Sequence, residues 1–153
     1  MNLRTSIEER YKEAFKSKNL DNTNALRLIK SAIKDKDIEN RTSESKKEIN
    51  DHQITSLLQN LIKQRKDSIE SFKTASRDDL IVKEQLEIDL INQFLPKQLN
   101  EREIEEIIKK IIKKQNLSSL KDMGALTNEL KSEHAGKIDM TMAGKIAKLL
   151  LNN

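Results

Sequence analysis

Residues that could carry out catalysis are few in this chain, and they are widely separated along it. The two histidines, His52 and His134, are 82 positions apart, and neither lies in the spacing of a zinc-binding helix. Carboxylates are abundant, but they lie in helix-like segments with a partner four residues away, as Glu105 does with Lys109. Cysteine is absent, which excludes a thiolate nucleophile or metal ligand. The sequence therefore predicts no catalytic residue, no cofactor and no metal site.

A second kind of chemistry, phosphate binding, is indicated near the C-terminus, where a small residue, a glycine and a lysine occur together twice. The segments are residues 135–137 and 143–145, and they contain two of the three glycines of the chain. Neither segment has the upstream glycine and downstream hydroxyl residue of a nucleotide-binding phosphate loop. Residues 107–153 carry nine lysines against four carboxylates, a net charge of +5, which suits contacts with nucleic-acid phosphates. A solvated lysine face explains the same charge equally well.

Six residues of this region are candidates for contact with a nucleic acid: Lys121, Lys131, Lys137, Lys145, Lys148 and Gly144. Two interpretations of Gly144 stay open. The first is close packing of another helix against a shallow face that Gly144 forms with Ala143 and Ala147. The second is docking of a ribose-phosphate ridge on that face. Gly136 is expected to end the sixth helix as the residue directly after its C-cap, where glycine is favoured.

The elements that position these residues are predicted to be helices. Hydrophobic and charged residues each make up 35% of the chain, with 3% aromatics, one proline and three glycines, so the turn formers of a β-fold are scarce. Apolar residues recur at three- and four-residue spacing in seven segments. Pro96 interrupts this pattern and marks the boundary between two domains. The predicted fold is all-α, with an N-terminal four-helix domain at residues 1–95 and a small C-terminal three-helix bundle at residues 96–153.

Helix starts and one connection are predicted from local signals. The longest apolar stripe runs from Ile54 to Phe72, and the polar residues 41–49 before it are expected to be a mobile connection. Side-chain caps of the kind that satisfy free backbone N–H groups are expected at four places. They are Asn50 with Gln53, Ser76 with Asp79, Asn100 with Glu103, and Asp139.

The sequence also predicts where the protein resides. No apolar run approaches the roughly 18 residues of a membrane span. Residues 1–16 contain acidic side chains and lack the apolar stretch of a signal peptide. A cytoplasmic monomer without membrane contact is the expectation.

Several ordered motifs resemble those of the YqeY family of small bacterial and organellar proteins. The segments that carry the resemblance are residues 26–39, 62–72, 75–105, 120–131 and 135–151, which together span nearly the whole chain. The family motifs are present as Arg77-Asp78-Asp79-Leu80, as Glu87 followed by Phe94-Leu95-Pro96-Lys97-Gln98-Leu99, and as Lys121-Asp122-Met123-Gly124. One departure is Met140, which stands where a second glycine commonly precedes the last helix of the family.

The resemblance implies a helical N-terminal domain joined to a C-terminal domain similar to the tail of GatB, the B subunit of glutamine-dependent tRNA amidotransferases. That tail contacts tRNA, whereas amidation and glutamine hydrolysis take place elsewhere in those enzymes. A label of carbon–nitrogen ligase with glutamine as amido-N donor would be inherited with the domain, and no residue of this chain supports an autonomous activity. The hypothesis is a module that binds tRNA or a tRNA amidotransferase or synthetase complex. The alternative is a protein–protein adaptor that uses the Ile54–Phe72 stripe or the domain boundary at Pro96.

Overall fold

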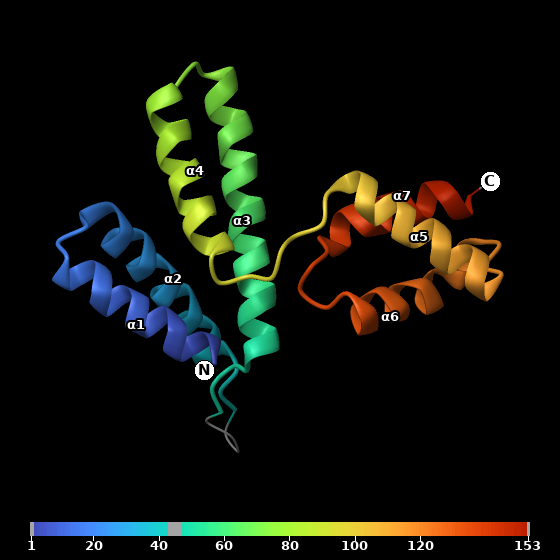
Figure 1. Cartoon of the computed structure of the whole chain (residues 1–153), viewed down its shortest axis with the longest axis horizontal. Helices are drawn as coiled ribbons and strands as arrows, with labels where there is room; N and C mark the ends of the chain where they lie inside the picture. The colour runs from blue at the N-terminus through green and yellow to red at the C-terminus, as the bar shows by residue number, and fades with distance from the viewer. Residues whose placement is uncertain (1, 43–46, 153) are drawn as a thin grey trace. The chain divides into compact units, whose positions relative to one another are not determined.

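The computed structural model describes residues 2–42 and 47–152, and every regular element in these residues is helical. This confirms the predicted all-α class. The chain divides into two compact units, an N-terminal unit (Met1–Leu95) and a C-terminal unit (Pro96–Asn153). Figure 1 traces the elements in chain order. They are α1 (Leu3–Lys16), α2 (Leu20–Glu39), α3 (Asp51–Thr74), α4 (Asp78–Asn92), α5 (Glu101–Gln115), the 3₁₀-helix η1 (Leu120–Asp122), α6 (Met123–Glu133) and α7 (Met140–Leu151).

Three of the four predicted caps are confirmed. Asn50 and Asn100 each form a capping box, in which the asparagine side chain accepts a backbone N–H three residues later and that residue's side chain accepts in return. Asp139 accepts from the N–H groups of Thr141 and Met142 at the start of α7. These short polar signals therefore set where α3, α5 and α7 begin.

The predicted cap at Ser76 is wrong. Ser76 adopts the left-handed backbone conformation with φ of 55°, so the helix starts one residue later and Arg77 takes the N-cap position. The Arg77 guanidinium instead holds Asp79 through hydrogen bonds of 3.2 and 3.1 Å. This ion pair holds the pKa of the Asp79 carboxyl below its usual value. A carboxylate in the first turn also complements the helix dipole.

The N-terminal unit consists of two helical hairpins, α1–α2 and α3–α4 (Figure 1). Their facing sides form one hydrophobic core, in which Leu26, Ile54 and Leu58 are fully buried. The apolar stripe of α3 therefore lies in this core, and the hypothesis that it serves as an adaptor surface is wrong. Its spacing of three and four residues is the spacing of a core-facing helix stripe.

A buried ion pair crosses the α3–α4 hairpin. The Arg65 Nε donates to Glu87 Oε2 at 2.8 Å, and both side chains are at least 85% buried. Arg65 also donates to the Leu61 carbonyl at 3.2 Å, so the guanidinium is held on two sides. Charges removed from water in this way are tolerated because they are paired and hydrogen-bonded.

A second polar cluster joins three segments of the N-terminal unit. Both Arg4 amino groups donate to the Asp37 carboxylate at 2.9 Å, and one of them also donates to the Ile49 carbonyl at 3.1 Å. The Ile49 N–H donates in turn to Asp37 at 2.9 Å. The predicted mobile connection at 41–49 lies partly outside the described residues, but its last residue, Ile49, is buried and tightly bonded.

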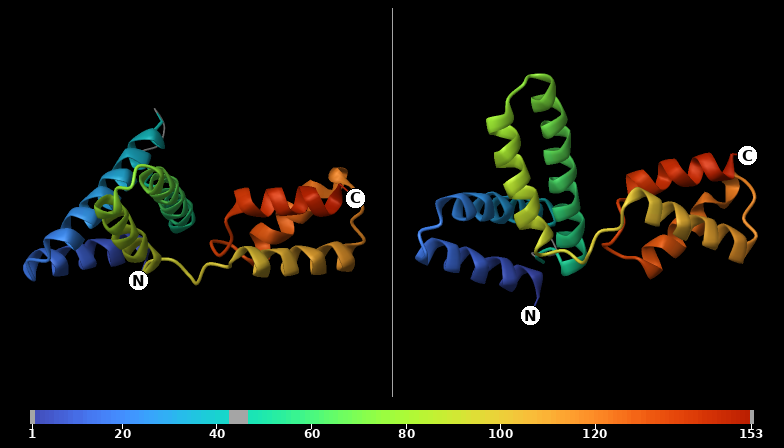
Figure 2. Two further views of the ribbon diagram at one scale, coloured as in Figure 1. Left: turned by 90° about the horizontal axis from the view of Figure 1, so that it is seen from above. Right: turned by 45° about the horizontal axis from the view of Figure 1, so that its top comes forward.

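The C-terminal unit has its own hydrophobic core between α5, α6 and α7. Figure 2 shows α5 and α7 side by side in this unit. Ala143 and Ala147 of α7 are completely buried against the other helices, together with Ile104 and Ile108 of α5. Small side chains at the two alanines let the helix backbones approach closely.

The segment after Pro96 belongs to the C-terminal unit. The Leu99 N–H donates to the Lys137 carbonyl at 2.8 Å, and the Gln98 amide donates to the Gly136 carbonyl at 2.6 Å. Leu99 packs against the C-terminal core, whereas Leu95 packs against the N-terminal core. The change from one core to the other therefore takes place within Pro96 and Lys97.

Candidate nucleic-acid interface

One face of α7 brings together three of the six candidate residues. Lys145 and Lys148 are exposed, and Gly144 lies between them and the buried face of the helix. Gly144 and Lys145 stand four and three positions before Lys148, so the three residues are neighbours on the helix surface, and Gly144 adjoins the buried Ala147. We refer to Gly144, Lys145 and Lys148 as the α7 surface.

Gly144 does not pack closely against another helix, so the first interpretation of this glycine is wrong. A Cβ atom added at Gly144 would meet no heavy atom within 4 Å. The close packing of α7 comes from Ala143 and Ala147, which are buried, whereas Gly144 lies at the edge of the buried face. Gly144 instead leaves a shallow open place beside two lysines, where an approaching group meets backbone rather than a side chain.

Lys137 lies in the connection between α6 and α7, apart from the α7 surface. Helix α6 has its C-cap at His134, so Gly136 is one residue further along than the predicted position. The Lys137 N–H donates to the His134 carbonyl at 3.1 Å, which closes a four-residue turn. Gly136 has φ of 75° at the third position of this turn, where the left-handed conformation favours glycine. The Lys137 side chain is exposed at the end of the turn.

The two remaining candidate lysines lie at separate places. Lys121 is exposed on η1, next to Asp122, whose carboxylate accepts from the N–H groups of Ser118 and Ser119 at 2.8 and 3.2 Å. These two bonds hold the pKa of Asp122 below its usual value. Lys131 is exposed in the last turn of α6, where a cation also complements the helix dipole. The structure thus gathers Lys145 and Lys148 and disperses the other three.

The charges of the candidate lysines are uncompensated within the described part of the chain. None of the five forms an ion pair there, although Lys109 of the same unit pairs with Glu105 at 3.2 Å. Cations that are exposed and unpaired attract phosphates through a long-range field. They are available to a polyanion without first breaking an internal bond.

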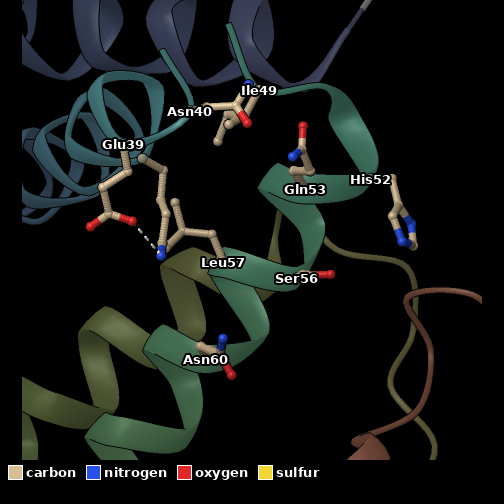
Figure 3. Close-up of a pocket in the computed structure, with 9 residues that line it drawn as sticks. Glu39, Asn40, Ile49, His52, Gln53, Ser56, Leu57 and Asn60 are labelled. Atoms are coloured by element: carbon tan, nitrogen blue, oxygen red, sulfur yellow. Dashed lines mark hydrogen bonds and ion pairs between the residues drawn. The ribbon is translucent and has the colours of Figure 1, made fainter. Parts of the chain in front are cut away.

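A cavity lies elsewhere, in the N-terminal unit between the end of α2 and the start of α3. It has a volume of about 550 Å³, and His52 and Asn60 are among the residues that line it (Figure 3). The only ion pair drawn there joins Lys36 and Glu39, both from α2, at 2.9 Å. His52 is exposed, and no carboxylate of the described residues forms an ion pair with it. No group of three or more metal-ligating side chains occurs among the described residues.

These features define a class of protein: a two-unit helical protein whose C-terminal unit presents an exposed cationic surface. The sequence profile of the family described as Yqey-like protein matches residues 4–151. The chain belongs to the YqeY family.

Curated relatives from fungi share part of this sequence. A protein of Saccharomyces cerevisiae strain YJM789, "Altered inheritance of mitochondria protein 41, mitochondrial", is 36% identical over 104 residues, covering 66% of this chain and 54% of the relative. A protein of the same name from Pyrenophora tritici-repentis is 35% identical over 101 residues, covering 64% and 52%. An uncharacterized protein of Schizosaccharomyces pombe is 34% identical over 95 residues, covering 62% and 73%. The chain thus spans about half the length of the first two relatives.

The names of these relatives contradict the expectation of a cytoplasmic protein. Both named relatives are described as mitochondrial, so the similarity gives no support to a cytoplasmic location. The expectation was based on the features of a secretory signal, and those features do not bear on import into an organelle. Within the described residues, no helix combines the length and apolar character that crossing a bilayer requires.

Proposed function

We propose that the C-terminal unit is a binding module for structured RNA of the tRNA type and that the α7 surface is its main contact. The observation that carries this proposal is the open backbone at Gly144, flanked by two exposed lysines without an ion-pair partner in the described chain. Lys137 and Lys121 extend the cationic character of the unit beyond α7. Such a surface suits the phosphate ridge of a folded RNA.

Recognition in this proposal is by shape and backbone. The deep major groove of A-form RNA excludes side chains, so folded RNA is contacted through phosphates and 2′-hydroxyls. Base stacking is disfavoured because the chain has one tyrosine and no tryptophan. That tyrosine, Tyr11, lies in the N-terminal unit with the Lys30 ammonium 4.1 Å above its ring. The C-terminal unit therefore acts through charge and a shallow fit.

Two further parts of the proposal concern organisation. We propose that the units are independent domains, a four-helix domain at residues 1–95 and a three-helix domain at residues 96–153, because each has its own core. We also propose that the protein assists a tRNA-handling complex, such as an amidotransferase, through its likeness to the tail of the amidotransferase B subunit. Any link to carbon–nitrogen ligase activity with glutamine as donor then depends on partner subunits.

The test is binding of an unmodified tRNA transcript to the full chain, measured by fluorescence anisotropy at several salt concentrations. We expect a dissociation constant on the order of micromolar that rises steeply with salt. Lys145→Glu combined with Lys148→Glu is expected to abolish binding. Lys12→Glu combined with Lys16→Glu changes the net charge equally on exposed positions of α1 and is the matched control.

The comparison of the two variants decides the proposal. Unchanged binding by the α1 variant, with loss in the α7 variant, would support a located interface. Equal losses from both would reduce the effect to net charge and would contradict the proposal. Lys137→Glu alone measures whether the α6–α7 connection takes part in the same contact.

A further inference from the structure

A groove between α1 and α2 has no part in the function proposed above. It encloses about 370 Å³ in the N-terminal unit, and apolar atoms make up the larger part of its lining. Ile7 and Ile33 form the buried floor, and Tyr11 stands at its side. Figures 1 and 2 show these two helices side by side as a hairpin.

The charges along this groove are unequal. Its two carboxylates are both engaged, because Glu8 pairs with Lys30 and Asp37 pairs with Arg4, each at 2.9 Å. Two further cations line the groove, Arg27 and Lys34, and within the described chain neither has a carboxylate partner. Arg27 donates only to the Tyr11 hydroxyl, at 3.3 Å. The groove therefore presents an excess of two positive charges to a partner.

Exposed apolar side chains continue the same face beyond the groove. On α2, Leu20 and Ile38 are 70% and 50% exposed, and they stand seven residues before Arg27 and four residues after Lys34. On α1, Phe15 is 62% exposed and follows Tyr11 by one helical turn, with ring centroids 6.3 Å apart. The result is an elongated surface, with exposed apolar side chains at both ends and, between them, two cations that have no carboxylate partner in the described chain.

We propose that this surface, defined by Phe15, Leu20, Arg27, Lys34 and Ile38, binds an acidic amphipathic helix of a partner protein. Helices dock in such grooves through apolar residues spaced three, four and seven apart. The distance from Leu20 to Ile38 corresponds to about 27 Å of helix, so a segment of about 18 residues reaches both ends. Glutamates or aspartates at its centre would meet Arg27 and Lys34.

RNA suits this surface less well than it suits α7. Exposed leucine, isoleucine and phenylalanine offer nothing to a phosphate ridge, and the Tyr11 ring is covered by the Lys30 ammonium. A small anion would occupy the centre but would leave the apolar ends in water. An acidic helix covers both kinds of side chain at once.

The experiment uses the full chain and two designed 18-residue fluorescent helical peptides with leucines at three- and four-residue spacing. One peptide carries glutamates among these leucines, at the positions that would face Arg27 and Lys34. Its matched control carries lysines at the same positions. Fluorescence anisotropy measures binding to the wild type, to Arg27→Glu with Lys34→Glu, and to the control variant Lys12→Glu with Lys16→Glu. Circular dichroism verifies that the variants keep their helical content.

We expect the glutamate peptide to bind the wild type at least about ten-fold more tightly than the lysine peptide. The Arg27→Glu, Lys34→Glu variant should lose at least about ten-fold in affinity, and the Lys12→Glu, Lys16→Glu variant should stay within about two-fold. Phe15→Ser with Ile38→Ser should also weaken binding, because it removes apolar contacts at both ends of the surface. Both side chains are exposed, so the core should be unaffected.

Three results would overturn the proposal. The first is no binding of the glutamate peptide up to about millimolar concentration, a range in which even weak complexes are detected. The second is equal binding by wild type and the Arg27→Glu, Lys34→Glu variant. The third is a competition result: a tRNA transcript displaces the peptide that is bound to the Lys145→Glu, Lys148→Glu variant. That result would assign the surface to RNA.

Discussion

The α3–α4 hairpin and helix α7 use charged residues in opposite ways. In the hairpin, Arg65 and Glu87 are removed from water and satisfy each other at 2.8 Å. On α7, Lys145 and Lys148 stay in water and have no ion-pair partner among the described residues. The hairpin has the higher density of charged residues, with 14 among residues 51–92 against two among the 12 residues of α7. A high density of charge therefore does not by itself indicate a surface that is available to a partner.

The difference follows from the chemistry of the two cations. Arginine carries a planar group with several fixed donors, which can satisfy a carboxylate and a carbonyl together inside a protein. Lysine carries a compact, strongly hydrated ammonium on a flexible stem, which favours exposure. Two arginines, Arg4 and Arg65, accordingly form the more buried ion pairs of the N-terminal unit, whereas Lys145 and Lys148 are exposed on the C-terminal unit.

The largest expected effect tests the buried side of this comparison. Glu87→Ala leaves the Arg65 guanidinium buried without its carboxylate, so we expect the free energy of unfolding of the N-terminal unit to fall by about 3–5 kcal/mol. Urea denaturation followed by circular dichroism measures the loss. Glu70→Gln is the control, because Glu70 pairs with Lys73 in water and should leave stability nearly unchanged.

Replacing both partners separates loss of charge from loss of packing. Arg65→Met with Glu87→Leu removes the buried charges together and keeps much of the volume, so most of the lost stability should return. A double variant as unstable as Glu87→Ala would show that the pair is needed for more than mutual satisfaction of charge.

A smaller effect is expected at Asp37, with a defined dependence on pH. The hydrogen bonds from Arg4 hold the pKa of Asp37 below its usual value. The ion pair therefore stabilises the folded chain at neutral pH, and its contribution is lost as the pH falls through the lowered pKa. Asp37→Asn should cost about 2 kcal/mol at pH 7. The difference in the free energy of unfolding between wild type and variant should begin to shrink below about pH 4, the ordinary pKa of an aspartate. A constant difference across pH would contradict this assignment.

Gly144→Ala sharpens the exposed side of the comparison. Because an added methyl group meets no heavy atom within 4 Å, it should raise the stability of the C-terminal unit by about 1 kcal/mol. The same methyl group should weaken binding of the tRNA transcript if backbone approaches RNA at this place. Gly124→Ala on α6, also in open space, is the control that should leave binding unchanged. A stabilised Gly144→Ala protein with unaltered RNA binding would remove this glycine from the interface.

The smallest effect is expected for one exposed lysine. Lys148→Ala should leave the melting temperature nearly unchanged, because the side chain has no partner in the described structure. If Lys148 contacts one phosphate, the slope of log affinity against log salt should fall by about one unit. An unaltered slope would limit the interface to the other lysines.

Fold class and most helix starts were predictable because their signals are local. The boxes at Asn50 and Asn100 depend on residues three positions apart, and the α3 and α5 stripes depend on a three- and four-residue spacing. The prediction at Ser76 was wrong because the three-residue spacing from Ser76 to Asp79 does not fix the backbone conformation of the serine, which is left-handed. Asp79 is instead bonded to Arg77, the residue at the N-cap position.

The candidate site was predictable only in part. The lysine-rich sequence at the C-terminus indicated the five candidate lysines, all of which are exposed, but it did not indicate that α7 would gather only two of them. The environment of Gly144 depends on which face of α7 turns inward, and both faces carry small residues. Arg27 and Lys34 were not predicted as binding residues, because the positive and negative charges of the first 96 residues almost balance. Their seven-residue spacing, which places both on one face of α2, was the available signal.

The cluster of Arg4, Asp37 and Ile49 has a consequence for how the N-terminal unit folds. Each helical hairpin brings together residues close in sequence, a process that is fast. The hydrogen bond from Arg4 to the Ile49 carbonyl instead closes a separation of 45 residues and reaches beyond the α1–α2 hairpin, with a higher entropic cost. We therefore expect it to form last, as the two hairpins dock. The Ile49 amide is bonded to the Asp37 side chain and takes no part in the backbone hydrogen bonds within the helices. Hydrogen exchange at this amide would therefore report on that docking event and not on the unwinding of either hairpin.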